Sequence, residues 1–129
     1  MIKILIHVQD SRYSGIRPSH FSGIQMVLDA MGIIDLEYID MHEDGYFAPQ
    51  GQVRHADFDA FIAAHPGEEI WLLDPDGDEL DTLPAGAWLC VGPAGGFSQE
   101  HKDGCPKVKL NLANPIEARD ALMMALGKI

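Results

Sequence analysis

Five short apolar runs, separated by polar or helical sequence, constrain the fold of this 129-residue chain most strongly. A strand covered on both faces of a parallel sheet needs a nearly continuous apolar run, whereas a strand with one wet face alternates. Runs of this kind that alternate with helical patterns are typical of a parallel α/β sheet. The predicted strands are residues 2–8, 33–39, 69–73, 87–91 and 107–112.

Three segments between or after these runs predict helices. Apolar residues recur at helical spacing over 21–31, and Gly32 supplies a C-terminal stop. A shorter helix is expected over 58–64, and a final one over 115–126 with Asn114 as its cap. The remaining long stretches are predicted to be irregular connections: 41–55 and 74–84.

The charge distribution restricts the partners that the chain can have. The net charge is −11, which argues against a general nucleic-acid binder. All of the excess lies in residues 33–85, which hold fourteen acidic side chains and only Arg54 as a base. The two ends of the chain are neutral to slightly basic. An RNA substrate is therefore disfavoured by the total charge but not excluded.

A glycine-rich loop follows the apolar run 87–91. It contains Gly92, Pro93 and Gly96, and the chain returns to polar sequence at Ser98. A buried strand followed by such a loop and a capping serine is how α/β proteins bring bare backbone close to a ligand. The loop alone is equally compatible with a tight turn that binds nothing.

The loop 92–98 reads Gly-Pro-Ala-Gly-Gly-Phe-Ser, and an alanine-rich final helix follows it. This sequence resembles the C-terminal part of the SPOUT methyltransferases, most closely the small-subunit rRNA uridine methyltransferases, whose loop reads Gly-Pro-Glu-Gly-Gly-Phe-Ser. Two departures stand out: Ala94 replaces the glutamate, and 110–115 lacks the family's usual Leu-Gly-x-x-Ile-Leu-Arg sequence. Over residues 86–129 the resemblance rests on matching motifs, whereas over residues 1–85 it rests only on the order of strands and helices.

The resemblance implies a single SPOUT-like domain over 1–129, in which 86–129 forms a deep trefoil knot that holds S-adenosylmethionine. The cofactor would contact the loops that end the third and fourth strands and surround the fifth. Backbone groups there would read the purine edge, and apolar side chains its faces. The residues carried over are Leu73, Gly92, Gly96, Leu110 and Leu112. The two glycines lie in the matching motif, whereas the leucines rest on strand order alone and are equally compatible with a core position.

Catalytic residues are not evident from the sequence. Arg12 and Arg17 lie in the loop after the first strand, a region from which SPOUT enzymes often draw residues that handle the substrate. They are the candidates, and a solvent-exposed polar loop is the simpler interpretation.

Several other functions are disfavoured. The six histidines lack paired metal-ligand spacing and two cysteines cannot complete a structural zinc site, so no metal is predicted. The acidic stretch 74–81 lacks the spacing of a calcium loop. The sequence lacks the Gly-x-Ser-x-Gly elbow of a serine hydrolase and the P-loop lysine of a nucleotide-phosphate site, so both functions are disfavoured. With no long apolar segment, no signal-peptide pattern and no disulfide framework, a cytoplasmic protein without membrane contact is expected.

The preferred interpretation is an S-adenosylmethionine-dependent methyltransferase that acts on RNA. The apolar positions of the final helix spread around most of its circumference, which predicts a homodimer through this helix. One alternative is a non-catalytic knotted domain that serves binding or dimerisation. The other is an unrelated flavodoxin-like ligand-binding domain, in which the glycine loop is only a turn.

Overall fold

The strands of this chain lie side by side in one parallel sheet, as the continuous apolar runs predict. The computed structural model describes residues 1–8, 15–41, 48–49, 51–93 and 96–129. Within those residues the sheet has six strands in the order β3-β2-β1-β5-β4-β6. In chain order they are β1 (Lys3–His7), β2 (Leu36–Ile39), β3 (Val53–His55), β4 (Ile70–Glu79), β5 (Trp88–Val91) and β6 (Lys107–Lys109).

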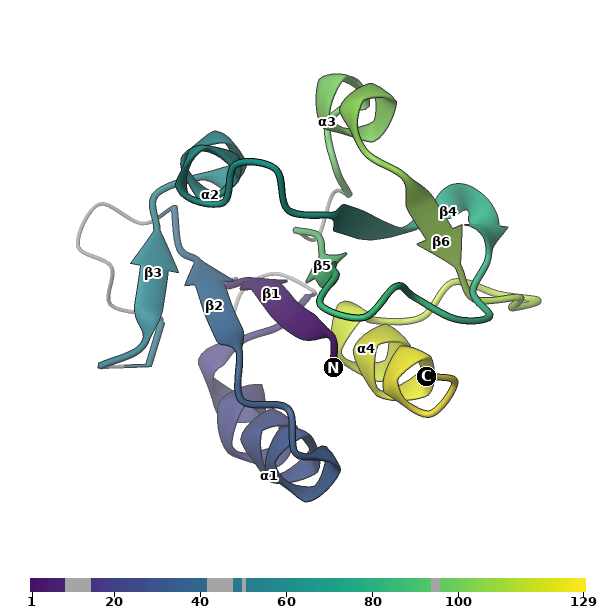
Figure 1. Cartoon of the computed structure of the whole chain (residues 1–129). Coiled ribbons are helices and arrows are strands. Elements are labelled where there is room, and N and C mark those ends of the chain that lie inside the picture. The colour runs from purple at the N-terminus through teal and green to yellow at the C-terminus, as the bar shows by residue number, and fades with distance from the viewer. Residues whose placement is uncertain (9–14, 42–47, 50, 94–95) are drawn as a thin grey trace.

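Helices cover both faces of the sheet (Figure 1). On one face lie α1 (Phe21–Met31), preceded by the short 3-10 helix η1 (Pro18–His20), and α4 (Ala118–Leu126). On the other lie α2 (Phe58–Ala64) and α3 (Gln99–Gly104). Successive strand residues point to opposite faces. Ile4 and Ile6 therefore pack in the core on the α1 and α4 side, whereas Leu5 packs with α2. This double burial is the reason for the continuous apolar runs.

The strand predictions needed several corrections: β2 begins at Leu36 instead of residue 33, and β6 ends at Lys109 instead of residue 112. Strand β3 lies in the stretch predicted to be irregular. It is a three-residue strand at the sheet edge, in which Val53 and Arg54 are exposed and no apolar run occurs. Strand β4 continues to Glu79, through acidic sequence that was expected to be a connection, because Asp78 pairs with Val108 of β6. The bounds of β3 and β4 are set by backbone pairing with a neighbouring strand, and the hydropathy of their side chains does not reveal this pairing.

The helix predictions were more accurate. Helices α1 and α2 have the predicted bounds, and Gly32 ends α1 in the left-handed conformation at φ 74°. Ser98 caps α3 as expected, since its Oγ accepts a hydrogen bond from the His101 N–H at 3.3 Å. The predicted start of the final helix was wrong. Helix α4 begins at Ala118 with Glu117 as its N-cap residue, so Asn114 is not the cap.

No helix in the described ranges has the length and apolarity needed to cross a bilayer. The predicted α/β class is confirmed by the six-stranded parallel sheet and its four α-helices, within the residues that the structure describes. The trefoil knot over 86–129 stays a prediction.

Candidate functional site

A pocket of about 640 Å³ opens near the carboxyl ends of β4, β5 and β6. In parallel α/β sheets this edge is where ligands bind, and the volume is in the range of small-molecule sites. Three chain segments form most of its walls: residues 73–76 of β4, residues 91–93 with 96–97 after β5, and residues 109–110 with 112–118 after β6. Residues 115–117, which were predicted to open the final helix, form part of this last wall, and α4 starts only at Ala118.

The five residues predicted to contact a cofactor all line this one pocket. They are Leu73, Gly92, Gly96, Leu110 and Leu112. Leu112 is more than one-third exposed, so the three leucines are not equally buried in the core. The structure thus brings residues of three separate loops together, while their role toward a cofactor stays a prediction.

The two glycines of the motif are needed for different reasons. Gly96 has φ +81°, a conformation that side-chain-bearing residues rarely adopt, and its N–H donates to the Pro93 carbonyl at 2.8 Å. Gly92 is needed for packing, because a Cβ atom there would lie 2.9 Å from the ring of Phe97. Backbone is therefore bare along this wall of the pocket. Ala94, which departs from the family motif, lies outside the described residues.

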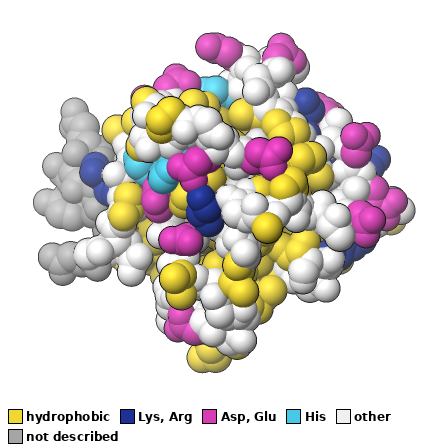
Figure 2. Space-filling view, in the orientation of Figure 1, with side chains coloured by type: hydrophobic (Ala, Val, Ile, Leu, Met, Phe, Trp, Pro, Cys, Tyr) yellow, Lys and Arg dark blue, Asp and Glu magenta, His cyan; other side chains and the backbone are white. Residues whose placement is uncertain are grey.

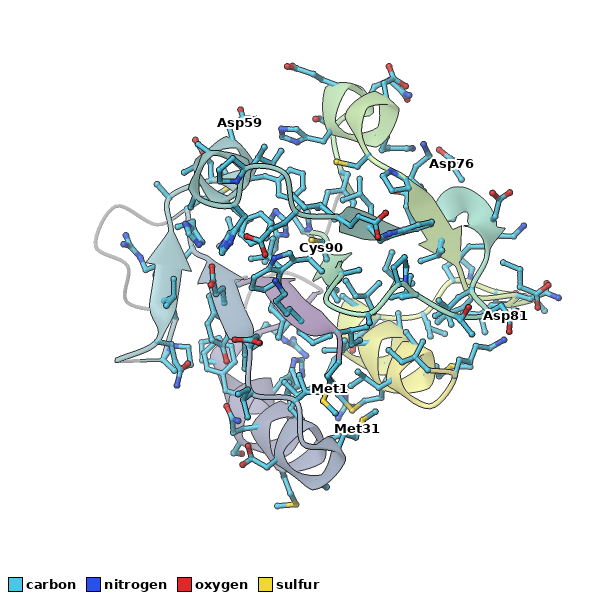
Figure 3. All side chains as sticks on the ribbon, viewed as in Figure 1. Met1, Met31, Asp59, Asp76, Asp81 and Cys90 are labelled. Atoms are coloured by element: carbon cyan, nitrogen blue, oxygen red, sulfur yellow. The ribbon has the colours of Figure 1, made fainter. Side chains whose placement is uncertain are left out.

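A buried acid and a lysine form a polar corner in the pocket, which sequence reasoning missed. Asp74 is only 5% exposed, and its Oδ1 accepts a hydrogen bond from the Asp76 N–H at 2.9 Å. The Nζ atom of Lys102 lies 3.6 Å from the same oxygen and also pairs with Asp76. Figure 3 labels Asp76, which lies beside β4 and β6. The hydrogen bond to Asp76 and the charge of Asp74 raise the pKa of Lys102. This corner can recognise the charged groups of a ligand. An acid that directly follows an apolar run was the available signal.

His7, at the end of β1, links this strand to the end of β5 beside the pocket. Its Nδ1 donates to the carbonyl of Val91 at 2.8 Å, and its ring meets Phe97 edge-on with centroids 5.5 Å apart. Val91 and Phe97 both line the pocket. Burial lowers the pKa of His7 to about 4, against the opposing effect of the bond to Val91. The imidazole is therefore neutral, with its proton on Nδ1.

Acid should destabilise the fold through His7. The unfolded side chain takes up a proton below about pH 6.5, whereas folded His7 does so only near its pKa of about 4. Between these values the unfolded state binds more protons, so stability is complete above the upper one and falls as the pH drops toward the lower. The free energy of unfolding should therefore be roughly 3 kcal/mol lower at the lower pH than at the upper one. Urea unfolding of wild type and His7→Asn near pH 7 and pH 4 measures it. Asparagine keeps an N–H for Val91, and an equal loss in both proteins would contradict the assignment.

The structure describes only one of the two candidate catalytic arginines, Arg17, and this residue does not line the pocket. Arg12 lies outside the described residues. Gly15, two residues before Arg17 in the chain, lines the pocket, and the backbone N–H of Arg17 donates to Nδ1 of His20 at 3.2 Å. Burial lowers the pKa of His20, and the nearby charges of Arg17 and then Arg119 lower it further. Arg17 and the start of α4 are therefore close in space.

Neither a protein-family model nor a curated protein matches this chain. The chain is similar in structure to a solved protein described as "Structural insights into the 2-OH methylation of C/U34 on tRNA". The TM-score is 0.67 at 18% sequence identity, and the match covers 98% of this chain and 95% of the other. At this identity the likeness establishes a shared fold over nearly the whole length of both chains.

Proposed function

We propose that this chain is a single-domain, SPOUT-like methyltransferase of RNA that uses S-adenosylmethionine, with 86–129 forming the knot. One observation carries the proposal: five residues chosen from a family motif and strand order line one pocket at the carboxyl edge of the sheet. The solved structure of similar fold, whose printed subject is 2-OH methylation of tRNA, supports it.

The pocket suits the purine and the methionine part of this cofactor. The bare backbone beside Gly92 and Gly96 can read a purine edge, and the side chains of Leu73 and Leu110 can cover its faces. Asp74 and Lys102 offer opposite charges to the amino and carboxylate groups of the methionine part. The bound cofactor would supply an activated methyl group on a sulfonium. The protein then has chiefly to align the acceptor with it and to exclude water.

Basic side chains around the pocket support an RNA acceptor. Lys109 lines the pocket, Arg17 lies near the start of α4, and Arg119 in the first turn of α4 is half-exposed. Three carboxylates also line the pocket, and two of them, Asp74 and Asp76, lie close to Lys102, which reduces their repulsion of phosphate. A ribose hydroxyl of tRNA is the first acceptor to test, by likeness to the solved structure.

Titration with S-adenosylhomocysteine in a calorimeter tests the proposal. We expect one molecule to bind per chain, because one pocket holds all five predicted contact residues. Transfer of labelled methyl from S-adenosylmethionine to unmodified tRNA, followed by nucleoside analysis, then tests the acceptor. Absence of binding would contradict the proposal, and binding of a flavin instead would favour the flavodoxin-like alternative. Binding without transfer to any RNA would favour the non-catalytic knotted domain.

The proposal includes a homodimer through α4 and a cytoplasmic location. Within one chain, α4 buries Leu122, Ala125 and Leu126, so its apolar surface is partly used against the sheet. Met124 remains 45% exposed, and Ile116 just before the helix 41%. These two side chains are the apolar surface that a second copy would cover, and light scattering at micromolar concentration measures the mass.

A further inference from the structure

Three metal-ligating side chains converge on the α2 face of the sheet, away from the pocket. Glu37 is on β2, His55 ends β3, and His65 directly follows α2. One carboxylate oxygen, Oε1 of Glu37, lies 2.7 Å from Nε2 of His55 and 2.8 Å from Nε2 of His65. These three atoms all lie within 4.8 Å of one another, and no other group of this kind occurs in the described part of the chain. None of the three residues lines the pocket.

A fourth residue holds one of the histidines in place. Oε2 of Glu68 lies 2.6 Å from Nδ1 of His65, on the opposite side of the ring from Glu37. The other oxygen of Glu68 accepts hydrogen bonds from the indole N–H of Trp88, at 3.1 Å, and from Lys3. Metal-binding histidines almost always donate the N–H of their second ring nitrogen to an outer carboxylate, backbone carbonyl or water, which aims the other nitrogen at the metal. Nε2 of His65 is aimed at the cluster in this way.

Aromatic packing makes the cluster rigid but leaves it accessible. The ring of His65 lies 4.8 Å from those of Phe61 and Trp88, and the ring of His55 meets Phe61 edge-on at 5.4 Å. The side chains of His55, His65 and Glu37 are still 11%, 17% and 16% exposed, which allows an ion to enter. Figure 2 shows histidine, acidic and basic side chains side by side on this face of the molecule.

The charge of the cluster also favours a cation. Glu37 and Glu68 bring two carboxylates to the histidines, and Lys3, on the far side of Glu68, offsets one of them. Two imidazoles and a carboxylate are the ligand set of zinc sites with three protein ligands and an open fourth position. Tetrahedral zinc with bonds of 2.0–2.2 Å separates its ligand atoms by ~3.3 Å. The present contacts of 2.7 Å and 2.8 Å therefore need to open only slightly.

We propose that Glu37, His55 and His65 bind a divalent transition-metal ion, with zinc as the best fit, and that Glu68 orients His65. The ion would tie the edge strand β3 to β2 and to the end of α2. A ligand that binds only the folded state stabilises it in proportion to the logarithm of its concentration over Kd. Zinc should therefore raise the melting temperature.

Calorimetric titration of chelator-treated protein with zinc chloride tests the site. We expect one zinc per chain and a higher melting temperature with zinc than with chelator. Glu37→Gln keeps the size of the side chain but removes the charged ligand, and we expect ~100-fold weaker binding for it and for His65→Ala. Glu68→Gln, which alters only the orienting group, should lose about 10-fold.

His101→Ala is the matched control. His101 also pairs with a carboxylate, Asp59 at 2.8 Å on the outer side of α2, but the described residues offer no third ligand there (Figures 1 and 3). It should keep wild-type zinc affinity. Circular dichroism in chelator establishes that each variant is folded. Absence of stoichiometric binding by wild type would overturn the proposal, as would zinc affinity that the cluster variants leave unchanged. The pocket is not involved, so S-adenosylhomocysteine binding reports on the proposed function independently.

Discussion

Gly77→Ala should cost about 3 kcal/mol of folding free energy, at the upper end of the usual range for overpacking. A Cβ atom at this position would lie 2.4 Å from the carbonyl carbon of Lys107 and 2.6 Å from the Val108 nitrogen. Both are backbone atoms of β6, so no side-chain rotation relieves the clash. The glycine lies where the register of β4 against β6 shifts, between Leu73 and Asp78. The two strands must separate to admit even one methyl group.

Urea unfolding measures this cost, with Gly23→Ala as the control. Gly23 is in α1, where an added Cβ meets nothing within 4 Å. That substitution should stabilise the protein by about 0.5–1 kcal/mol through helix propensity. Opposite signs for two identical chemical changes would locate the effect in the β4–β6 contact. A Gly77→Ala variant as stable as wild type would show that the strands are not packed this closely.

Gly96→Val should abolish measurable binding of S-adenosylhomocysteine without unfolding the chain. Apart from its chain neighbours, an added Cβ at Gly96 meets no atom of the described residues within 4 Å, so we expect the side chain to project into space that a ligand needs. The positive φ of 81° adds backbone strain of about 1–2 kcal/mol, which complicates a simple comparison with wild type. A control with the same strain is therefore required.

Gly86→Val supplies that control. Gly86 has φ 80°, and a Cβ there also meets nothing within 4 Å, but this residue does not line the pocket. We expect both variants to lose similar stability in thermal unfolding, and only Gly96→Val to lose ligand affinity, by ~100-fold or more. Equal affinities in the two folded variants would show that the loop after β5 is not the binding site.

Local signals in the sequence were sufficient for the elements that are specified locally. The continuous apolar runs around β1 and β5 predicted strands buried on both faces, and Ile4, Leu5 and Ile6 are fully buried on alternating sides. Helix α1 has the predicted bounds because its apolar spacing and the left-handed Gly32 are properties of the segment itself. The parallel α/β class followed from these patterns.

Elements that depend on a distant partner were predicted less well. β3 is too short to show a hydropathy pattern, and it exists through its pairing with β2, in which His55 lies opposite Ile39. The acidic extension of β4 is likewise held by β6. Residues 115–117 were predicted to open the final helix, but in the structure they precede α4 and line the pocket.

The sequence by itself determined the sheet-and-helix alternation, the glycine loop and the set of leucines and glycines that line one pocket. Only the tertiary structure placed Lys102 against Asp74, or brought Glu37, His55 and His65 to one point. Motif spacing detects metal ligands when they share a helix or a turn, because the local geometry then fixes their separation. Here each ligand comes from a different element, and their distance depends on how β2, β3 and α2 pack together.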